Sequence, residues 1–200
     1  LYAVASTFAA VDWIMSLDPH WFSTIFGLLF LIQQALAAMS FVLLMLAMLS
    51  RTAPMASIIK PVNVHDCGKF LLACTMIWAY FSFSQFLIIW SANLPEEIPW
   101  YLERMSHGWE WVSIGLLVGQ FFVPFFFLLS RDLKRSAGRV ARVAAFVLVM
   151  RYVDFFWNLG PAMHRESPMV HWMDLAALAA LGGVWIGLFA WQYRARPLLP

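Results

Sequence analysis

Long apolar runs, separated by short polar connections, set the pattern of this chain. A helix of about 20 apolar residues is long enough to cross the hydrocarbon layer of a bilayer. Five such runs are almost free of charge, and a sixth at 1–17 is interrupted only by Asp12. The five cover residues 24–49, 70–92, 111–130, 140–157 and 175–193. We therefore predict an all-α, polytopic membrane protein with six transmembrane helices in this chain.

The composition agrees with a chain embedded in a membrane. Hydrophobic residues make up 62% of it and charged residues 12%, compared with about 25% charged residues in soluble domains. The net charge of +2 is not gathered in one basic patch, which argues against a nucleic-acid partner. The first apolar run begins at Leu1 without the pattern of a signal peptide. We expect the chain to be a fragment of a longer membrane protein.

Lysine and arginine alternate between the two predicted sides of the membrane. Short cytoplasmic loops are rich in these residues. Ten of them lie in the connections 50–69 and 131–142 and in the tail: Arg51, Lys60, Lys69, Arg131, Lys134, Arg135, Arg139, Arg142, Arg194 and Arg196. The other connections hold only Arg104 and Arg165. We predict that the ten cations mark the cytoplasmic side and that both ends of the chain lie toward it.

The opposite side of the membrane is predicted to be acidic, histidine-bearing and rich in tryptophan. Its ionisable residues include Asp18, His20, Glu96, Glu97, Glu103, His107, Glu110, His164, Glu166 and His171. Its tryptophans are Trp21, Trp100, Trp109, Trp111 and Trp172. Because tryptophan is enriched at membrane interfaces, we interpret these five as interfacial anchors.

Two residues of opposite charge fall inside the fifth predicted helix. Arg151 and Asp154 are three residues apart and share one helix face, which Asn158 continues. Counted from the basic end of that helix, Arg151 lies near mid-membrane and Asp154 toward the outer half. Since charges inside a membrane usually face a bundle interior or a cavity, the pair is either a structural ion pair or part of a proton relay or quinone site. Asp12, close to the outer surface, is either an interfacial carboxylate or part of the same site.

The connection between the first two helices carries another candidate. Asp18 and Pro19 predict a tight turn that presents His20 at the outer interface. A histidine beside an acid is a proton acceptor suited to neutral pH. The simpler alternative is an exposed His20, with Asp18 and Ser23 serving only as caps.

A second candidate group lies at the cytoplasmic side. His65, Asp66 and Lys69 open the third helix and are candidates for the mouth of a proton path. The alternative is that His65 or Asp66 only caps that helix. Both interpretations remain open from the sequence.

The cysteines predict no metal or haem chemistry in this chain. Cys67 and Cys74 form no haem-attachment motif and no iron–sulfur cluster motif. We interpret them as small core thiols. Any haem or metal is therefore expected on another chain, or held by histidine.

Several stretches together resemble the ActF family, the integral membrane subunits of bacterial alternative complex III. That complex is a quinol:electron-acceptor oxidoreductase. The resemblance covers nearly the whole chain and is specific over its long runs. The stretches that resemble the family are 12–27, the opening His65-Asp66-x-Gly68-Lys69, the run 78–97, Pro124 before a Phe-rich run, and Arg151-x-x-Asp154 before an aromatic run.

The resemblance implies a fold and a set of partners. ActF subunits are of the NrfD-like, polysulfide-reductase type, with about ten helices in two four-helix bundles plus peripheral helices. Residues 1–17 would then be a helix from the preceding part, 23–158 the second four-helix bundle and 172–194 a peripheral helix. Haem c and iron–sulfur clusters are expected on partner subunits, which also include a homologous membrane subunit and, in some complexes, a terminal oxidase. The expected location is the bacterial inner membrane.

The expected function is that of a membrane subunit in quinol oxidation, serving quinone interaction, proton conduction and assembly. Asp12, His20, Arg151 and Asp154 are the candidates toward the outer side. His65, Asp66 and Lys69 are the candidates for a cytoplasmic entrance. One alternative is a purely structural anchor for redox subunits. Another is a proton channel or transporter without a redox role, although the inverted repeats typical of transporters are not evident.

Overall fold

The computed structural model describes residues 1–164 and 167–195. Every regular element in these residues is helical, so the all-α prediction is confirmed. The chain divides into two compact units after Pro168. Arg165, Glu166 and Arg196, which entered the charge pattern above, lie outside the described residues.

The first unit holds all but one of the helices. Its elements are α1 (Tyr2–Trp13), η1 (Met15–Leu17), α2 (Phe26–Leu49), α3 (Met55–Ile58), α4 (Pro61–Ala92), α5 (Ile98–Glu103), α6 (Trp109–Leu116), η2 (Leu117–Phe122), α7 (Val123–Leu129), α8 (Arg131–Arg135) and α9 (Ala137–Met163). The second unit holds α10 (Trp172–Ala195). The short helices α3, α5 and α8 lie in connections that the apolar pattern leaves without structure.

Four helices in the described part of the chain are long and apolar enough to cross a membrane. They are Phe26–Leu49, Pro61–Ala92, the continuous rod Trp109–Leu129 and Trp172–Arg194. The apolar stretch Tyr2–Leu17 is shorter, and α9 has the length but carries four charged residues. A membrane protein is therefore supported, while the count of six crossings stays a prediction.

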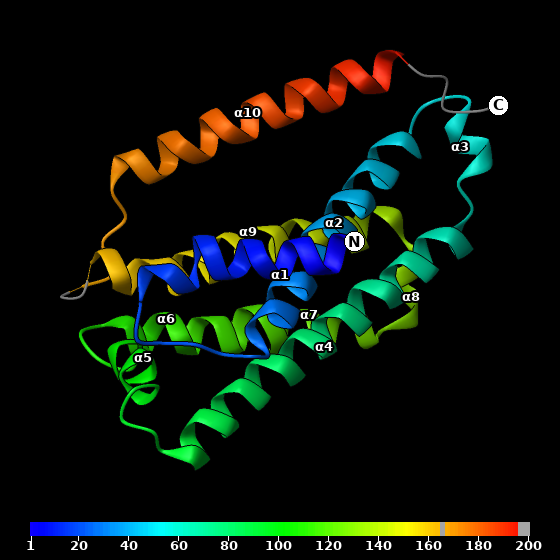
Figure 1. The fold of residues 1–200 in the computed structure, drawn as a ribbon. Coiled ribbons are helices and arrows are strands. Elements are labelled where there is room, and N and C mark those ends of the chain that lie inside the picture. The colour runs from blue at the N-terminus through cyan, green and yellow to red at the C-terminus, as the bar shows by residue number, and fades with distance from the viewer. Residues whose placement is uncertain (165–166, 196–200) are drawn as a thin grey trace. The chain divides into compact units, whose positions relative to one another are not determined.

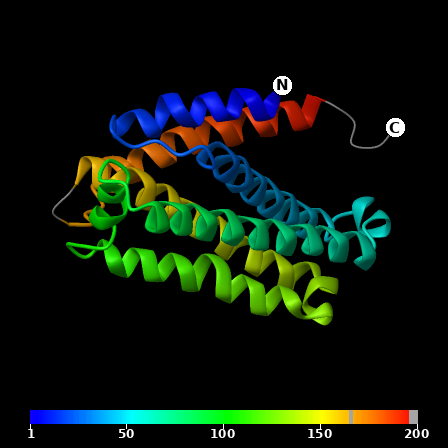
Figure 2. The ribbon, with the colours of Figure 1, turned by 60° about the horizontal axis from the view of Figure 1, so that its bottom comes forward.

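Helix α2 lies at the centre of the first unit. It packs against α1, α4 and α9, and the α6–η2–α7 rod packs against α4 and α9 (Figures 1 and 2). Helix α1 comes so close that a Cβ on Gly27 would lie 2.6 Å from Thr7 Cγ2. The core between the helices is closed by fully buried apolar side chains, among them Leu36, Leu43, Leu71, Leu128 and Val147.

The rod contains a π-helical segment, η2, directly before Pro124. Proline has no N–H, and its ring collides with the carbonyl four residues earlier, here that of Gln120. The wider π-helical turn, Leu117–Phe122, contains Gln120, the residue whose carbonyl the proline ring would otherwise meet. Single π-turns inside helices are frequent at functional sites, and this one borders the cavity described below.

Two capping alternatives from the sequence are wrong. Helix α4 begins at Pro61, a residue suited to the first helical position, so His65 and Asp66 lie inside the helix. At α2 the N-cap is Ile25, which makes no side-chain cap, and Ser23 Oγ donates to Gln85 Oε1 of α4 at 3.5 Å instead.

The two ends of the first unit differ in charge. The basic end holds α3 and α8, and the acidic end holds η1 and α5, opposite each other in Figure 1. Exposed residues mark both ends, with Arg135 in α8 and Glu96 in the connection before α5.

We predict that the acidic end faces the periplasm, because cytoplasmic loops are enriched in Lys and Arg. In a background with Cys67 and Cys74 replaced by alanine, Glu96→Cys should react with a membrane-impermeant maleimide on intact cells. Arg135→Cys should react only after lysis. Labelling of position 135 but not 96 on intact cells would reverse the orientation.

Candidate functional site

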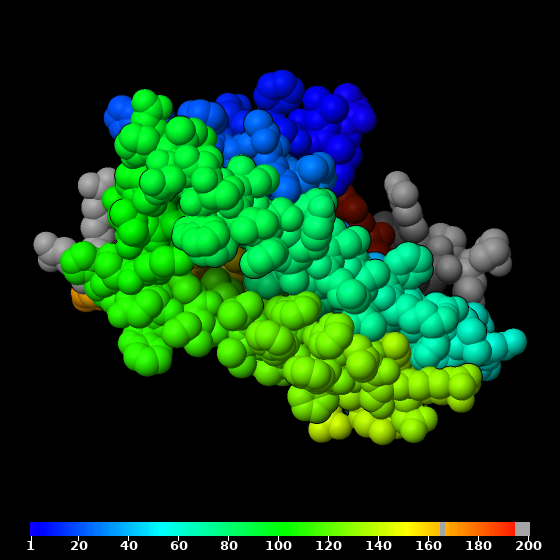
Figure 3. All heavy atoms as spheres, turned by 90° about the horizontal axis from the view of Figure 1, so that it is seen from below, coloured from blue at the N-terminus to red at the C-terminus, as the bar shows by residue number. Residues whose placement is uncertain are grey.

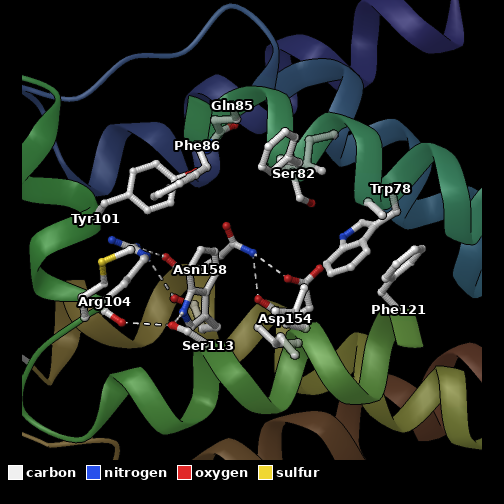
Figure 4. Close-up of a pocket in the computed structure, with 17 residues that line it drawn as sticks. Trp78, Ser82, Gln85, Phe86, Tyr101, Arg104, Ser113, Phe121, Asp154 and Asn158 are labelled. Atoms are coloured by element: carbon white, nitrogen blue, oxygen red, sulfur yellow. Dashed lines mark hydrogen bonds between the residues drawn. The ribbon is translucent and has the colours of Figure 1, made fainter. Parts of the chain in front are cut away.

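A cavity of about 360 Å³ lies among α2, α4, α5, the α6–η2 segment and α9 (Figure 4). Its walls are mostly apolar and aromatic, with Trp78, Phe83, Phe86, Phe121 and Trp157 among them. Its polar lining consists of Ser82, Gln85, Tyr101, Arg104, Ser113, Asp154 and Asn158. An apolar cavity with a few convergent polar groups is the usual form of a small-molecule site.

The cavity is bordered by exposed apolar side chains on its open side. Phe83 of α4, Leu117 of η2 and Met105 before α6 line it and are exposed. Figure 1 shows α4 diverging from α6 toward α5, and Figure 3 looks onto this face, which is hollowed between the two helices. Both helices belong to predicted membrane spans, so this opening is expected to face lipid.

One member of a buried ion pair, Asp154, lines the cavity. Arg151 Nη2 donates to Asp154 Oδ2, and the two side chains are 4% and 3% exposed. Gln33 Nε2 of α2 donates to the same carboxylate oxygen at 2.8 Å. Asn158 Nδ2 donates to the Asp154 backbone carbonyl at 2.7 Å and lies 3.4 Å from Oδ1. The pairing predicted from the i,i+3 spacing is therefore confirmed, whereas its role stays a prediction.

Several buried polar atoms have no hydrogen-bond partner. Arg151 Nε and Nη1 have no hydrogen-bond partner, and neither amide atom of the fully buried Gln120 has one. Of the Arg151 guanidinium nitrogens, only Nη2 is paired, with the Asp154 carboxylate. Asp154 also lines the cavity, so a ligand there would meet an oriented carboxylate that can accept a proton.

Arg104 closes the acidic end of the cavity. Pro161 lies in the last turn of α9 and has no N–H, so the Trp157 carbonyl lacks its helical partner. Arg104 Nε donates to that carbonyl at 3.2 Å, and Nη2 donates to the Asn158 carbonyl at 2.7 Å. Nη1 donates to the Trp100 carbonyl at 2.8 Å. One side chain therefore fastens the α5 connection to the end of α9.

The environment of Arg104 suits this role. The side chain is 2% exposed, and its guanidinium carbon lies 3.6 Å from the centre of the Trp100 ring. Burial lowers the pKa of Arg104 to about 9, so the group remains charged at neutral pH. The sequence pattern counted Arg104 only as a lone outer cation, and the signal that could have revealed it is Pro161, which frees a carbonyl.

Three tryptophans interpreted as interfacial anchors are instead buried in the first unit. Trp21 stacks on Trp100 with ring centres 4.4 Å apart, and Trp100 meets Trp157 edge to face. Trp109 is fully buried, and its Nε1 donates to the His164 carbonyl at 3.2 Å. The burial of Trp21, Trp100 and Trp109 corrects the interpretation, because their rings pack helix ends together. Trp111 is exposed, as an anchor would be.

The other outer candidates do not join the cavity. Asp12 and His20 are exposed, and Asp18 is half-buried at the end of η1. None of the three lines the cavity. The predicted turn at Asp18 is present, with Trp21 N donating to the Asp18 carbonyl at 3.0 Å. These residues lie at the acidic end but outside the Asp154 network.

The cytoplasmic candidates form a separate cluster at the basic end. Lys69 Nζ lies 3.0 Å from Asp66 Oδ1, and His65 Nδ1 lies 3.7 Å from the same oxygen. Along α4, Asp66 is about 28 Å from Gln85 at the cavity, at about 1.5 Å per residue. Buried Leu71 lies between them on the same helix. The structure therefore does not bring the two groups together.

Neither a metal centre nor a family assignment comes from these observations. Among the described residues, no group of three or more His, Cys, Asp or Glu side chains is placed to hold a metal ion, and Cys67 and Cys74 are both free thiols. Comparison with protein-family models gives no match, and comparison with curated proteins gives no significant match.

Proposed function

We propose that this chain is an NrfD-like membrane subunit of a quinol-oxidising respiratory complex in the bacterial inner membrane. The observation that carries the proposal is the Asp154 carboxylate, buried among helices and held by Arg151 and Gln33 beside a mostly apolar cavity. Ionisable groups are costly inside a membrane and mark sites where ions, protons or substrates are handled. The ActF resemblance gives the reaction to which such a site would belong.

The chemistry of quinol oxidation fits the groups present. A quinol gives up two protons as it gives up two electrons, and the protons need an acceptor within hydrogen-bond reach. Asp154 is the acceptor we assign, because its carboxylate lines the cavity and is oriented by Arg151 and Gln33. The electrons would pass to iron–sulfur clusters and c-type haems of partner subunits. This chain would supply the helical site and the proton-accepting carboxylate.

The test separates proton handling from scaffolding. Asp154→Asn removes the titratable group but leaves Arg151 unpaired, so the double change with Arg151→Gln provides a charge-balanced form. We expect membranes with either variant to lose most quinol-dependent electron transfer, measured per assembled complex. Glu96→Gln, an exposed acid-to-amide change at the same end, is the control and should retain activity.

Normal turnover of the assembled double variant would contradict a proton-accepting role and leave the chain as a structural anchor. A proton channel without a redox role would be favoured by a different result. The parent membranes would then show no quinol-dependent electron transfer, and the variants would lose proton movement.

A further inference from the structure

Two grooves flank the first turns of α9 at the basic end of the first unit. One lies against α7 and α8, has Phe127 and Leu133 among its walls, and measures about 430 Å³. The other lies against the end of α2, has Leu44 and Met48 among its walls, and measures about 260 Å³. Apart from arginines, every residue that lines either groove is apolar or glycine. Each groove therefore combines an apolar floor with positive charge.

Three arginines supply this charge, and one of them joins the two grooves. Arg142 lines both, Arg139 lines the groove against α7 and α8, and Arg51 lines the groove against α2. All three residues are exposed, and none forms an ion pair with an acid in the described part of the chain. The neighbouring acid Asp132 accepts from Arg139 Nη2 only through its backbone carbonyl, at 2.8 Å. The three guanidinium groups are therefore available to an anion from outside this unit.

The arginines lie at one end of each groove and the apolar walls extend away from them. Along α9, Phe146 lies about 6 Å beyond Arg142, and along α2, Leu44 lies about 10 Å before Arg51, at about 1.5 Å per residue. Both α2 and α7 belong to predicted membrane spans, so the grooves run from the membrane edge toward the hydrocarbon layer. A phospholipid has the same order of groups, with its phosphate at the edge and its acyl chains beneath.

We propose that the start of α9 binds one anionic phospholipid, whose phosphate is held by Arg142 and whose two acyl chains lie in the two grooves. Guanidinium groups bind phosphate oxygens in a bidentate manner, and basic pockets between transmembrane helices bind anionic lipid headgroups. Arg51 and Arg139 add positive charge on either side of Arg142. A zwitterionic lipid also carries an ammonium, which would meet no acid among the lining residues. The site is separate from the Asp154 cavity and does not rest on the proposed function.

The binding experiment uses the full protein, purified with its associated subunits and reconstituted into phosphatidylcholine vesicles. The probe is a trace of phosphatidylglycerol with a diazirine in one acyl chain, and the matched probe is phosphatidylcholine with the same chain. We expect the phosphatidylglycerol probe to label the groove walls around Met48, Phe127 and Phe146 at least about tenfold more than the phosphatidylcholine probe. Labelled peptides are located by mass spectrometry.

Variants at the basic end provide the matched comparison. Arg142→Gln removes the guanidinium shared by the grooves and should weaken phosphatidylglycerol labelling of both about tenfold, the loss expected for a hydrogen bond to a charged group. Arg135→Gln removes an exposed arginine of α8 that lines neither groove, and should leave labelling unchanged.

A second pair of variants tests the grooves themselves. Ala145→Phe adds a ring to the wall of the groove against α2 and should reduce labelling there. Val149→Phe, an exposed change one turn further along α9 and outside both grooves, should not.

Three results with the parent protein would overturn the proposal, so the test does not depend on the folding of a variant. Equal labelling by the two probes would mean that bulk lipid fills the grooves without selection. Selective labelling elsewhere on the chain would place the anionic lipid at another site. Grooves that neither probe labels would be covered by a protein partner instead of lipid. Full labelling of a folded Arg142→Gln variant would equally contradict the assignment of the phosphate to Arg142.

Discussion

Asp154→Asn or Arg151→Gln alone should destabilise the first unit by about 3–5 kcal/mol, the loss measured when one partner of a buried pair is removed in soluble proteins. The reason is that either change leaves one charge buried without its counter-ion, since both side chains are almost fully buried. Gln33 donates to the carboxylate but cannot neutralise the guanidinium. The measurement is the thermal stability of the detergent-extracted protein and its yield in the membrane.

The double variant Arg151→Gln with Asp154→Asn should be milder than either single change, because it leaves no unpaired charge. A control pair with the same spacing exists on α4, where Lys69 and Asp66 are in contact but exposed. Exposed ion pairs contribute little, so Asp66→Asn and Lys69→Gln should leave stability unchanged. Additive losses at Arg151 and Asp154 would show that the two residues are not coupled.

Arg104→Met should also destabilise the protein strongly, by about 3–5 kcal/mol, because hydrogen bonds from a charged donor are worth about 1.5–3 kcal/mol each and do not add fully. The change leaves the Trp157 and Asn158 carbonyls without this donor and removes the guanidinium from the Trp100 ring. Arg104→Lys should recover part of the loss, since an ammonium keeps the charge but not the planar fork.

The control for Arg104 is another arginine that donates to a backbone carbonyl. Arg139 Nη2 donates to the Asp132 carbonyl at 2.8 Å, but Arg139 is exposed. Arg139→Met should therefore have little effect on stability. If Arg104→Met were equally mild, Arg104 would not fasten α5 to α9.

The helices could be predicted from the sequence because a helix that spans lipid needs a run of about 20 apolar residues. The run 24–49 became Phe26–Leu49, and 111–130 became the rod Trp109–Leu129. Boundaries shifted where polar residues continue a helix beyond its apolar part. Helix α4 begins at Pro61, nine residues before the predicted run, and α9 extends to Met163 past Pro161.

The candidate site was predictable only where the contacts are local. Arg151 and Asp154 meet because three residues along a helix place them on one face. Gln33 joins them from α2, 121 residues away, and no local pattern indicates which of several glutamines would do so. Asp12 and His20 do not line the cavity, and the sequence could not show this because depth along a helix does not reveal which way a side chain faces.

Arg104 and the buried tryptophans show a second limit of prediction from the sequence. In the charge pattern, Arg104 indicated only on which side of the membrane its connection lies. It is nevertheless one of the most buried cations in the described part of the chain. Tryptophan at a helix end suits both an interface and a tightly packed end. Trp21 and Trp100 lie in a tightly packed helix end, because α5 brings the Trp100 ring onto the Trp21 ring.

The most direct test of the central claim is to purify the complex through an affinity tag on this chain and to assay it. We predict co-purification of c-type haem, seen in the reduced-minus-oxidised spectrum, together with iron–sulfur subunits and quinol:acceptor electron transfer. That activity should fall in the assembled Arg151→Gln, Asp154→Asn double variant. A tagged chain that purifies without haem or quinol-dependent activity, from membranes that retain both, would contradict it.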